Sequence, residues 1–200
     1  MVASTEKGLQ IITDRLSETA KTYDMKINVK KTKSMVMSRD IGRTMQIMVD
    51  GEQVEQVKQF KYLGTWLTED CRSSVDVKCR IALAKVAFNS RKELFTSRLQ
   101  MPLKKRIIKT VVWPVLLYGC ETWSLRKEEI QRLEVCEMWI WRRITKTSWK
   151  DKKSNDEVLK LVGKRRCLVD TMLARKKNWI SHVFQGEGLM LEAADKQKLF

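Results

Sequence analysis

The segment from residue 65 to the C-terminus contains almost no helix-breaking residues. Within it, proline occurs only at positions 102 and 114, and glycine occurs only at positions 119, 163, 186 and 188. Apolar residues recur through this segment at intervals of three and four, which is the spacing that one face of an α-helix requires. The segment therefore favours a domain of packed helices.

Several patterns predict individual helices in this segment. Pro102 suits the first turn of one helix, and Pro114 should kink or end that helix near Trp113 because proline lacks an amide donor. Further helices are expected over 130–144 and 168–183, and a capping box is expected at Ser154 and Glu157. One predicted apolar stripe, with three lysines seven residues apart on its flank, comprises Val77, Ile81, Ala84, Phe88 and Phe95, and the lysines are Lys78, Lys85 and Lys92.

The N-terminal third carries a different pattern. Helical spacing joins Leu9, Ile12, Leu16, Ala20 and Tyr23, and alternation predicts strands over 25–29 and 45–49. Asp50 and Gly51 then form a two-residue hairpin signal. We therefore expect an α+β, mostly α chain, with a small antiparallel sheet within residues 1–64, a helical domain over 65–185 and a disordered tail over 186–200.

The charge of the chain narrows the class of partner. Forty Lys and Arg residues against 24 Asp and Glu residues give a formal net charge of +16, which favours polyanions, nucleic acid first and an anionic membrane surface second. The densest basic stretch, Arg142 to Arg166, has Trp139, Trp141 and Trp149 at its start. Lysine and arginine neutralise phosphates and an exposed tryptophan stacks on bases, so this stretch is a candidate nucleic-acid surface. The alternative is that the tryptophans belong to the core and the charges are only solvated.

The cysteines and the hydropathy bear on location. Five widely spaced cysteines without a CxxC pair or a signal peptide indicate reduced thiols, which we expect to be small core residues. A zinc site formed by Cys120, Cys136, Cys167 and His182 is an alternative, although structural zinc ligands usually come in close pairs. No apolar run approaches the ~20 residues needed to cross a bilayer. We therefore expect a nuclear or cytoplasmic protein that is neither secreted nor bound to a membrane.

Catalytic motifs are scarce in the sequence. There is no Gly-rich phosphate loop, no GxSxG elbow and no HExxH sequence. Polymerases hold their metal ions between carboxylates, and the usual adjacent Asp-Asp pair does not occur. The doublet Glu128 and Glu129 is explained by the first turn of a helix, where negative charge complements the macrodipole.

Several stretches together resemble LINE-type (non-LTR) retrotransposon reverse transcriptases. They cover the chain to about residue 190 and comprise 6–10, 25–33, 60–64, 116–123, 144–149, 155–159 and 179–183. The resemblance implies that 27–33 corresponds to polymerase motif D, with Lys31 as the lysine that helps to protonate the leaving group and Lys33 as the next candidate. It also implies that Phe60, Tyr62, Leu63 and Gly64 form the primer-gripping hairpin, followed by a helical thumb and a C-terminal extension.

The family's Ala-Asp-Asp box is expected just upstream of Met1. Without these aspartates, which hold Mg²⁺ in the parent family, we expect the 200 residues to have no metal site, no cofactor and no polymerase activity. The leading hypothesis is a transposon-derived fragment that binds RNA or DNA backbone, in the parent a template–primer duplex. The residues predicted to contact nucleic acid are Lys78, Lys85, Lys92, Arg142, Arg143, Lys146, Lys150, Lys152, Lys153, Arg165 and Arg166.

Three other hypotheses stay open at this point. The second hypothesis is that the helical part serves as a protein-interaction module. A third is that the chain completes a polymerase whose N-terminal half is a separate chain. The fourth is a genomic relic without a selected role.

Overall fold

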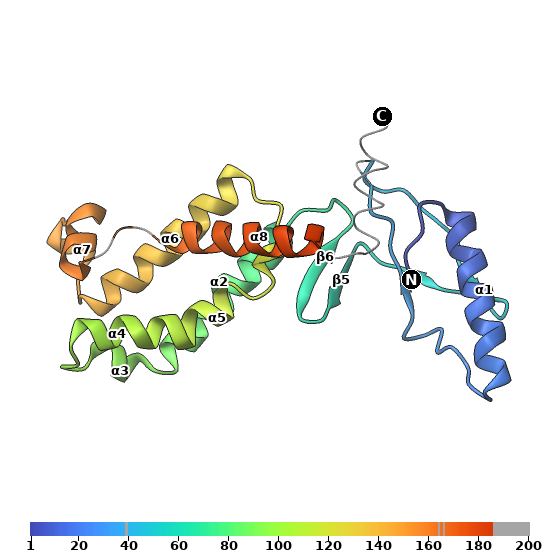
Figure 1. Ribbon diagram of the computed structural model, residues 1–200, viewed down its shortest axis with the longest axis horizontal. Coiled ribbons are helices and arrows are strands. Elements are labelled where there is room, and N and C mark those ends of the chain that lie inside the picture. Colours follow the sequence, from blue (N-terminus) through green and yellow to red (C-terminus); the bar gives the residue numbers. More distant parts are fainter. Residues whose placement is uncertain (39, 164, 166, 186–200) are drawn as a thin grey trace. The chain divides into compact units, whose positions relative to one another are not determined.

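The computed structural model describes residues 1–38, 40–163, 165 and 167–185 (Figure 1). The tail predicted over 186–200, as well as Arg166, lies outside these residues. The chain forms two compact units, Met1–Ser73 and Ser74–Phe200. It is α+β and mostly helical, as the sequence predicts. The boundary expected at residue 64 falls in the turn of a hairpin within the first unit.

The first unit is built on one helix and a short hairpin. Helix α1 (Glu6–Thr22) begins at Thr5, whose hydroxyl accepts a hydrogen bond from the Gly8 amide at 3.1 Å. Strands β2 (Met48–Val49) and β3 (Glu52–Gln53) pair antiparallel across a turn in which both central residues have positive φ, 51° at Asp50 and 82° at Gly51. This is the hairpin that the Asp-Gly pair predicts, and it is confirmed.

The face that α1 turns toward the hairpin is polar, which the sequence analysis did not predict. Thr13 and Ser17 are buried, while Ile12 and Leu16 of the predicted stripe are 40% and 45% exposed. The reason is that β2 needs partners for its free edge: the Gln10 side chain donates to the Met48 carbonyl and accepts from the Met48 amide. Ser17 similarly donates to the Asp50 carboxylate at 3.0 Å.

Residues 25–29 do not form the predicted strand. The chain instead turns at Asn28, whose side chain accepts a hydrogen bond from the Lys31 amide at 3.1 Å and whose carbonyl accepts one from the Thr32 amide at 2.9 Å. Ile27 and Val29 still pack against the small core of Ile47, Val49 and Val54. The alternation therefore marked buried positions and not a strand.

The remaining strands of this unit form two further pairs. Strand β1 (Lys33–Ser34) pairs parallel with β4 (Glu55–Gln56), so the sheet structure is not wholly antiparallel. Strands β5 (Gln59–Tyr62) and β6 (Thr65–Thr68) form an antiparallel hairpin. Its turn contains Leu63 at φ 46° and Gly64 at φ 85°.

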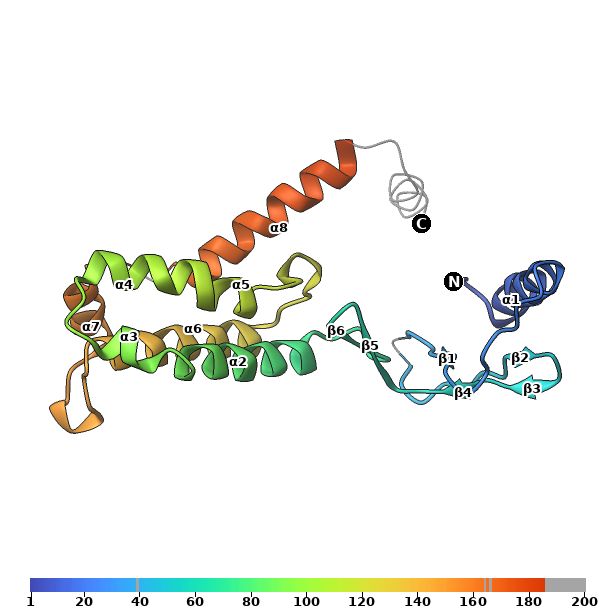
Figure 2. The same ribbon diagram turned by 90° about the horizontal axis from the view of Figure 1, so that it is seen from below.

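The second unit is helical over its described residues (Figure 2). Its elements are α2 (Ser74–Asn89), α3 (Lys92–Thr96), α4 (Met101–Ile107), the π-helix η1 (Ile108–Val112), α5 (Trp113–Leu116), η2 (Cys120–Thr122), α6 (Lys127–Ile144), η3 (Trp149–Asp151), α7 (Asn155–Val162) and α8 (Leu168–Gln185). Helix α2 packs against α6, η1 and α5, and α6 packs against α7 and α8. The capping box at Ser154 and Glu157 is confirmed, and α7 ends at Gly163.

The apolar stripe of 77–95 is divided between two helices. Helix α2 ends at Asn89, and the chain turns so that Phe95 of α3 stacks on Phe88, with 4.6 Å between ring centroids and 9° between ring planes. Phe95 is completely buried and stacks face to face on Phe88. It therefore belongs to the same core as Phe88, although it comes from a second helix.

The helical path does not end near Trp113, the first residue of α5, so that part of the prediction for Pro114 is wrong. The helical path runs from Met101 to Leu116, with η1 just before the proline. Proline has no amide hydrogen to donate to the preceding turn. The wider π-helical bonding, such as the hydrogen bond from the Trp113 amide to the Ile108 carbonyl, lets the helix continue past this missing donor.

Candidate nucleic-acid interface

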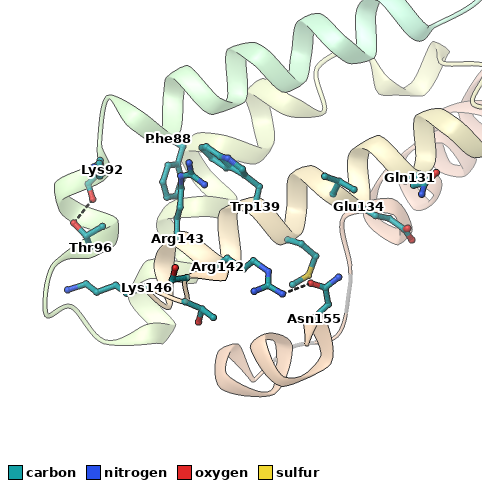
Figure 3. A pocket seen from close by; sticks show the side chains of 14 residues that line it. Phe88, Lys92, Thr96, Gln131, Glu134, Trp139, Arg142, Arg143, Lys146 and Asn155 are labelled. Carbon is teal, nitrogen blue, oxygen red and sulfur yellow. Dashed lines mark hydrogen bonds between the residues drawn. The ribbon is translucent and has the colours of Figure 1, made fainter. Parts of the chain in front are cut away.

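A groove with a volume of about 630 Å³ lies in the second unit beside α6 (Figure 3). One wall is formed by the end of α2 and by α3, which contribute Phe88, Lys92 and Thr96. The other wall comes from α6 and the residues that follow it. The remaining lining residues are Gln131, Glu134, Val135, Met138, Trp139, Arg142, Arg143, Lys146, Thr147, Ser148 and Asn155.

The charge of this groove is positive. Its lining includes Lys92, Arg142, Arg143 and Lys146, against Glu134 as its one acidic residue among those described. Lys92, Arg143 and Lys146 are exposed. The groove therefore offers three accessible cations within one concave surface.

An aromatic residue is held at the centre of this charge. Trp139 packs edge-on against Phe88, with 5.3 Å between ring centroids. The Arg143 guanidinium lies 3.7 Å from the centroid of the Trp139 ring, and the Lys85 ammonium lies 5.4 Å from it. These cations cover the ring, so a base could stack on the guanidinium plane of Arg143 more readily than on the indole itself.

A second hollow of about 500 Å³ adjoins the first. The two share Gln131, Val135 and Trp139 in their linings. The second hollow adds Lys78 and Lys85 from α2 and Arg132 from α6, together with Glu128. The three predicted lysines thus do not lie on one helix, since Lys92 begins α3, but all of them line the same extended groove.

Arg142 has a structural position that its sequence context did not reveal. It is 8% exposed, and its Nη2 donates to the Lys153 carbonyl and to the Asn155 side chain, both at 2.9 Å. Trp141 is fully buried and donates its indole N–H to Glu137 at 3.3 Å. Trp141 is therefore a core residue, as the alternative interpretation of the tryptophans stated; the side chain of Trp149 lies outside the description.

The other predicted contact residues that the structure describes are not among the groove lining residues. Lys150, Lys152 and Lys153 are exposed between α6 and α7, and Arg165 lines a separate pocket. In the first unit, Lys31 is exposed and Lys33 forms an ion pair with Glu55. Exposed side chains on the β5–β6 hairpin include Phe60, Tyr62 and Leu63 at 38%, 57% and 74%.

Two buried carboxylates hold this helical unit together and were not predicted. Asp76 of α2 is fully buried and accepts a hydrogen bond from the Trp123 indole N–H at 2.8 Å. Glu137 of α6 is 1% exposed and accepts from the Cys167 and Leu168 amides at 3.2 and 3.3 Å, at the start of α8. The signal for Glu137 was its place in the sequence, directly between the core residues Cys136 and Met138.

The thiols pack separately and do not form the alternative zinc site. Among the described residues, no three His, Cys, Asp or Glu side chains gather as ligands for a metal ion. Burial raises the pKa of both the Cys120 and the Cys136 thiol to about 11. No helix within the described ranges is long and apolar enough to cross a membrane.

Comparison with curated proteins relates the chain to transposon-encoded polymerases. It is 24% identical over 184 residues to an uncharacterized transposon-derived protein of Caenorhabditis elegans, which covers 88% of this chain and 64% of that protein. It is 27% identical over 146 residues to a probable RNA-directed DNA polymerase from transposon X-element of Drosophila melanogaster, covering 71% of this chain. Identity to the RNA-directed DNA polymerase from mobile element jockey, also of Drosophila melanogaster, is 22% over 151 residues and 74% of this chain.

The chain is therefore homologous to transposon-derived proteins and to RNA-directed DNA polymerases of LINE-like mobile elements, as its motifs imply. It spans only 16% of the length of each of these two polymerases. No protein-family model matches the chain. No solved structure matches it either.

Proposed function

We propose that the second unit binds the sugar–phosphate backbone of RNA or DNA, with little sequence selectivity, in the groove between α2–α3 and α6. The observation that carries this proposal is the convergence of six basic side chains from separate elements into one groove: Lys78, Lys85, Lys92, Arg132, Arg143 and Lys146. The homology to RNA-directed DNA polymerases supports it, because such enzymes act on nucleic acid.

The side chains that line the groove suit a backbone more than a base sequence. Lysine ammonium groups neutralise phosphates at many positions, and counterion release then supplies most of the binding free energy. Arg143 is fixed on Trp139 and offers one guanidinium face for stacking, which any base can use. In a polymerase of this kind, such a surface would hold template–primer duplex.

In this proposal the 200 residues do not perform nucleotide transfer by themselves, and the roles of Lys31 and of the β5–β6 hairpin are those they would have in a polymerase of this kind. Transfer needs metal ions held between carboxylates, and the printed sequence has no adjacent Asp-Asp pair. The exposed Lys31 would donate a proton to the leaving group, with Lys33 as the next candidate, and the β5–β6 hairpin would contact the primer end through Phe60, Tyr62, Leu63 and Gly64. In such a polymerase, Mg²⁺ would be held by residues outside these 200.

The location that we propose for the protein is nuclear or cytoplasmic.

A charge-reversal variant tests the position of the binding surface. The triple change Lys92→Glu, Arg143→Glu and Lys146→Glu should weaken binding of every oligonucleotide sequence. It should also lower the slope of log K against log salt by about 2, at roughly 0.7 for each lost single-strand phosphate contact. The control with the same change of net charge is Arg98→Glu, Lys160→Glu and Lys177→Glu, which alters exposed residues outside the groove.

Fluorescence anisotropy of labelled RNA and DNA oligonucleotides across a salt series measures both variants. The proposal requires the groove variant to lose clearly more affinity than the control. Equal losses would mean that the charge of the whole chain, and not this groove, governs binding.

A second candidate function is a helical protein-interaction module, and Val135 favours it. This side chain is 63% exposed although it lines both hollows. An apolar residue at that position would suit a protein partner. A discrete partner that stays bound to the chain after nuclease treatment, and that Val135→Asp releases, would support this second function.

A further inference from the structure

A separate basic pocket of about 460 Å³ lies on the second unit, away from the groove residues. Its lining comprises Lys109, Trp113, Arg165, Cys167, Thr171 and Arg175. None of these residues lines either hollow of the groove. The pocket is thus a second concave surface on the same unit.

Its three cations come from three different elements. Lys109 belongs to η1, Arg165 lies between α7 and α8, and Arg175 belongs to α8. All three are exposed, and no acidic residue is among the described lining residues. Like charges that converge in one cavity repel each other, so a bound anion would relieve an unfavourable interaction as well as form new ones.

Two of the remaining polar groups of the pocket are already engaged within the protein. The Thr171 hydroxyl donates to the Cys167 carbonyl at 2.6 Å, and the Cys167 amide donates to Glu137 at 3.2 Å. The charged donors that the pocket offers to a ligand are the Lys109 ammonium and the guanidinium groups of Arg165 and Arg175. These groups select an oxyanion, and arginine in particular selects phosphate.

The pocket offers no platform for a base. Its aromatic residue, Trp113, is only 4% exposed and packs edge-on against Trp141 in the core, with 6.0 Å between ring centroids. A free nucleotide would gain contacts here through its phosphates alone. A phosphodiester strand gains from every phosphate that passes the pocket, so a strand is the ligand that the chemistry favours.

We propose that Lys109, Arg165 and Arg175 form a second phosphodiester-binding site, so that the helical unit holds two segments of nucleic acid at once. This inference rests on the proposed function for the chemistry of the ligand. It adds a site that the groove does not include, and it predicts that one molecule of the protein bridges two strands.

The experiment separates the two sites by reversing charge in each one. The full chain carrying the triple groove reversal should retain binding of a (dT)12 oligonucleotide at low salt. Adding Lys109→Glu and Arg165→Glu should lower this residual affinity by at least about tenfold and the salt slope by about 1.4, for two lost contacts. Arg175 is left unchanged because it also contacts the Cys120 thiol.

The matched control adds Lys160→Glu and Lys177→Glu to the same groove variant. Circular dichroism of each variant confirms that the helices are intact. The charge-conserving pair Lys109→Arg and Arg165→Lys should keep the residual affinity within about threefold. If the pocket pair and the control pair weaken the residual binding equally, the second site is refuted.

Bridging is measured as energy transfer between two differently labelled oligonucleotides in the presence of limiting protein. The wild-type chain should give transfer, and either site variant alone should abolish it. Full transfer from the pocket variant would overturn the inference and leave the groove proposal standing. If the groove variant binds the oligonucleotide with unchanged affinity, the proposed function is refuted. The pocket variant would still test the second site separately.

Competition by inorganic pyrophosphate distinguishes a site for a phosphodiester strand from a site for free phosphates. A phosphodiester site should be competed only weakly by pyrophosphate at millimolar concentration. A contrary result would be that the groove variant binds pyrophosphate tightly but does not bind (dT)12, and that Lys109→Glu and Arg165→Glu abolish the pyrophosphate binding. This result would show a site for free phosphates and overturn the strand-bridging inference.

Discussion

Arg142 and Arg143 are neighbours in the sequence with different roles in the structure. The Arg142 guanidinium is buried and ties α6 to the start of α7 through Lys153 and Asn155. The Arg143 guanidinium lies on the exposed side of Trp139, in the groove. The density of basic residues in the sequence predicts that both arginines contact nucleic acid, because it does not indicate on which side of α6 each one lies.

This difference predicts opposite effects for two matched substitutions. Arg142→Gln should lower the free energy of unfolding by about 1–3 kcal/mol, since it removes hydrogen bonds from a buried charged donor. Arg143→Gln should change that free energy by less than about 0.5 kcal/mol, as is usual at the surface, yet weaken oligonucleotide binding. Urea unfolding and binding anisotropy on both variants check the prediction; it is wrong if Arg143→Gln proves the more destabilising.

Within single elements, two predictions from local signals are confirmed. The hairpin at Asp50–Gly51 and the capping box at Ser154 follow from backbone conformation and neighbouring side chains, and both are present. One error occurred where a distant contact decides the outcome, and another where a local hydrogen-bond pattern differs from the predicted one. The polar inner face of α1 depends on the edge of β2, whereas the turn at Asn28 is made by hydrogen bonds from the nearby Lys31 and Thr32 amides.

The site shows the same division between local and distant information. The lysines of α2 and α3 and the basic residues after Trp139 were predicted individually from the sequence. Their meeting in one groove depends on how α2 and α3 pack beside α6, which no local pattern encodes. The buried partners Asp76 and Trp123 are 47 residues apart in the chain, so their hydrogen bond could not be predicted from sequence spacing.

Gly163 provides a test of local control at the end of α7. It adopts φ 62° and ψ 46°, and its amide donates to the Lys160 carbonyl at 2.9 Å. Among the described residues, an added Cβ would meet the Lys105 ammonium at 3.6 Å, which is an ordinary contact, so the cost of substitution comes from the left-handed backbone. Gly163→Ala should therefore destabilise the unit by about 1 kcal/mol, and Gly163→Asn by less, because asparagine tolerates this conformation better.

Thermal unfolding of both Gly163 variants checks that order. Equal melting temperatures for the wild type and Gly163→Ala would contradict it. A melting temperature for Gly163→Asn below that of Gly163→Ala would contradict it as well.

For the whole molecule, the two units have very unequal cores. The described part of the second unit buries 22 apolar residues in one cluster, whereas the first unit buries Ile47, Val49 and Val54. The first unit also relies on short strand pairs, two of which contain only two residues in each strand. Small cores and short ladders give local unfolding a low free energy.

We therefore predict that amides of residues 1–73 exchange with solvent faster than the core helices α2 and α6 in the full chain. Val49→Ala should increase exchange within the first unit further, because it removes part of a side chain whose burial contributes about 2 kcal/mol. It should leave α2 and α6 unchanged if the two units unfold separately. Hydrogen exchange measured by mass spectrometry checks both points, with the wild-type chain as reference. Slowest exchange in α1 and the β2–β3 hairpin would contradict the unequal stability, and a parallel increase in α6 would show that the units unfold together.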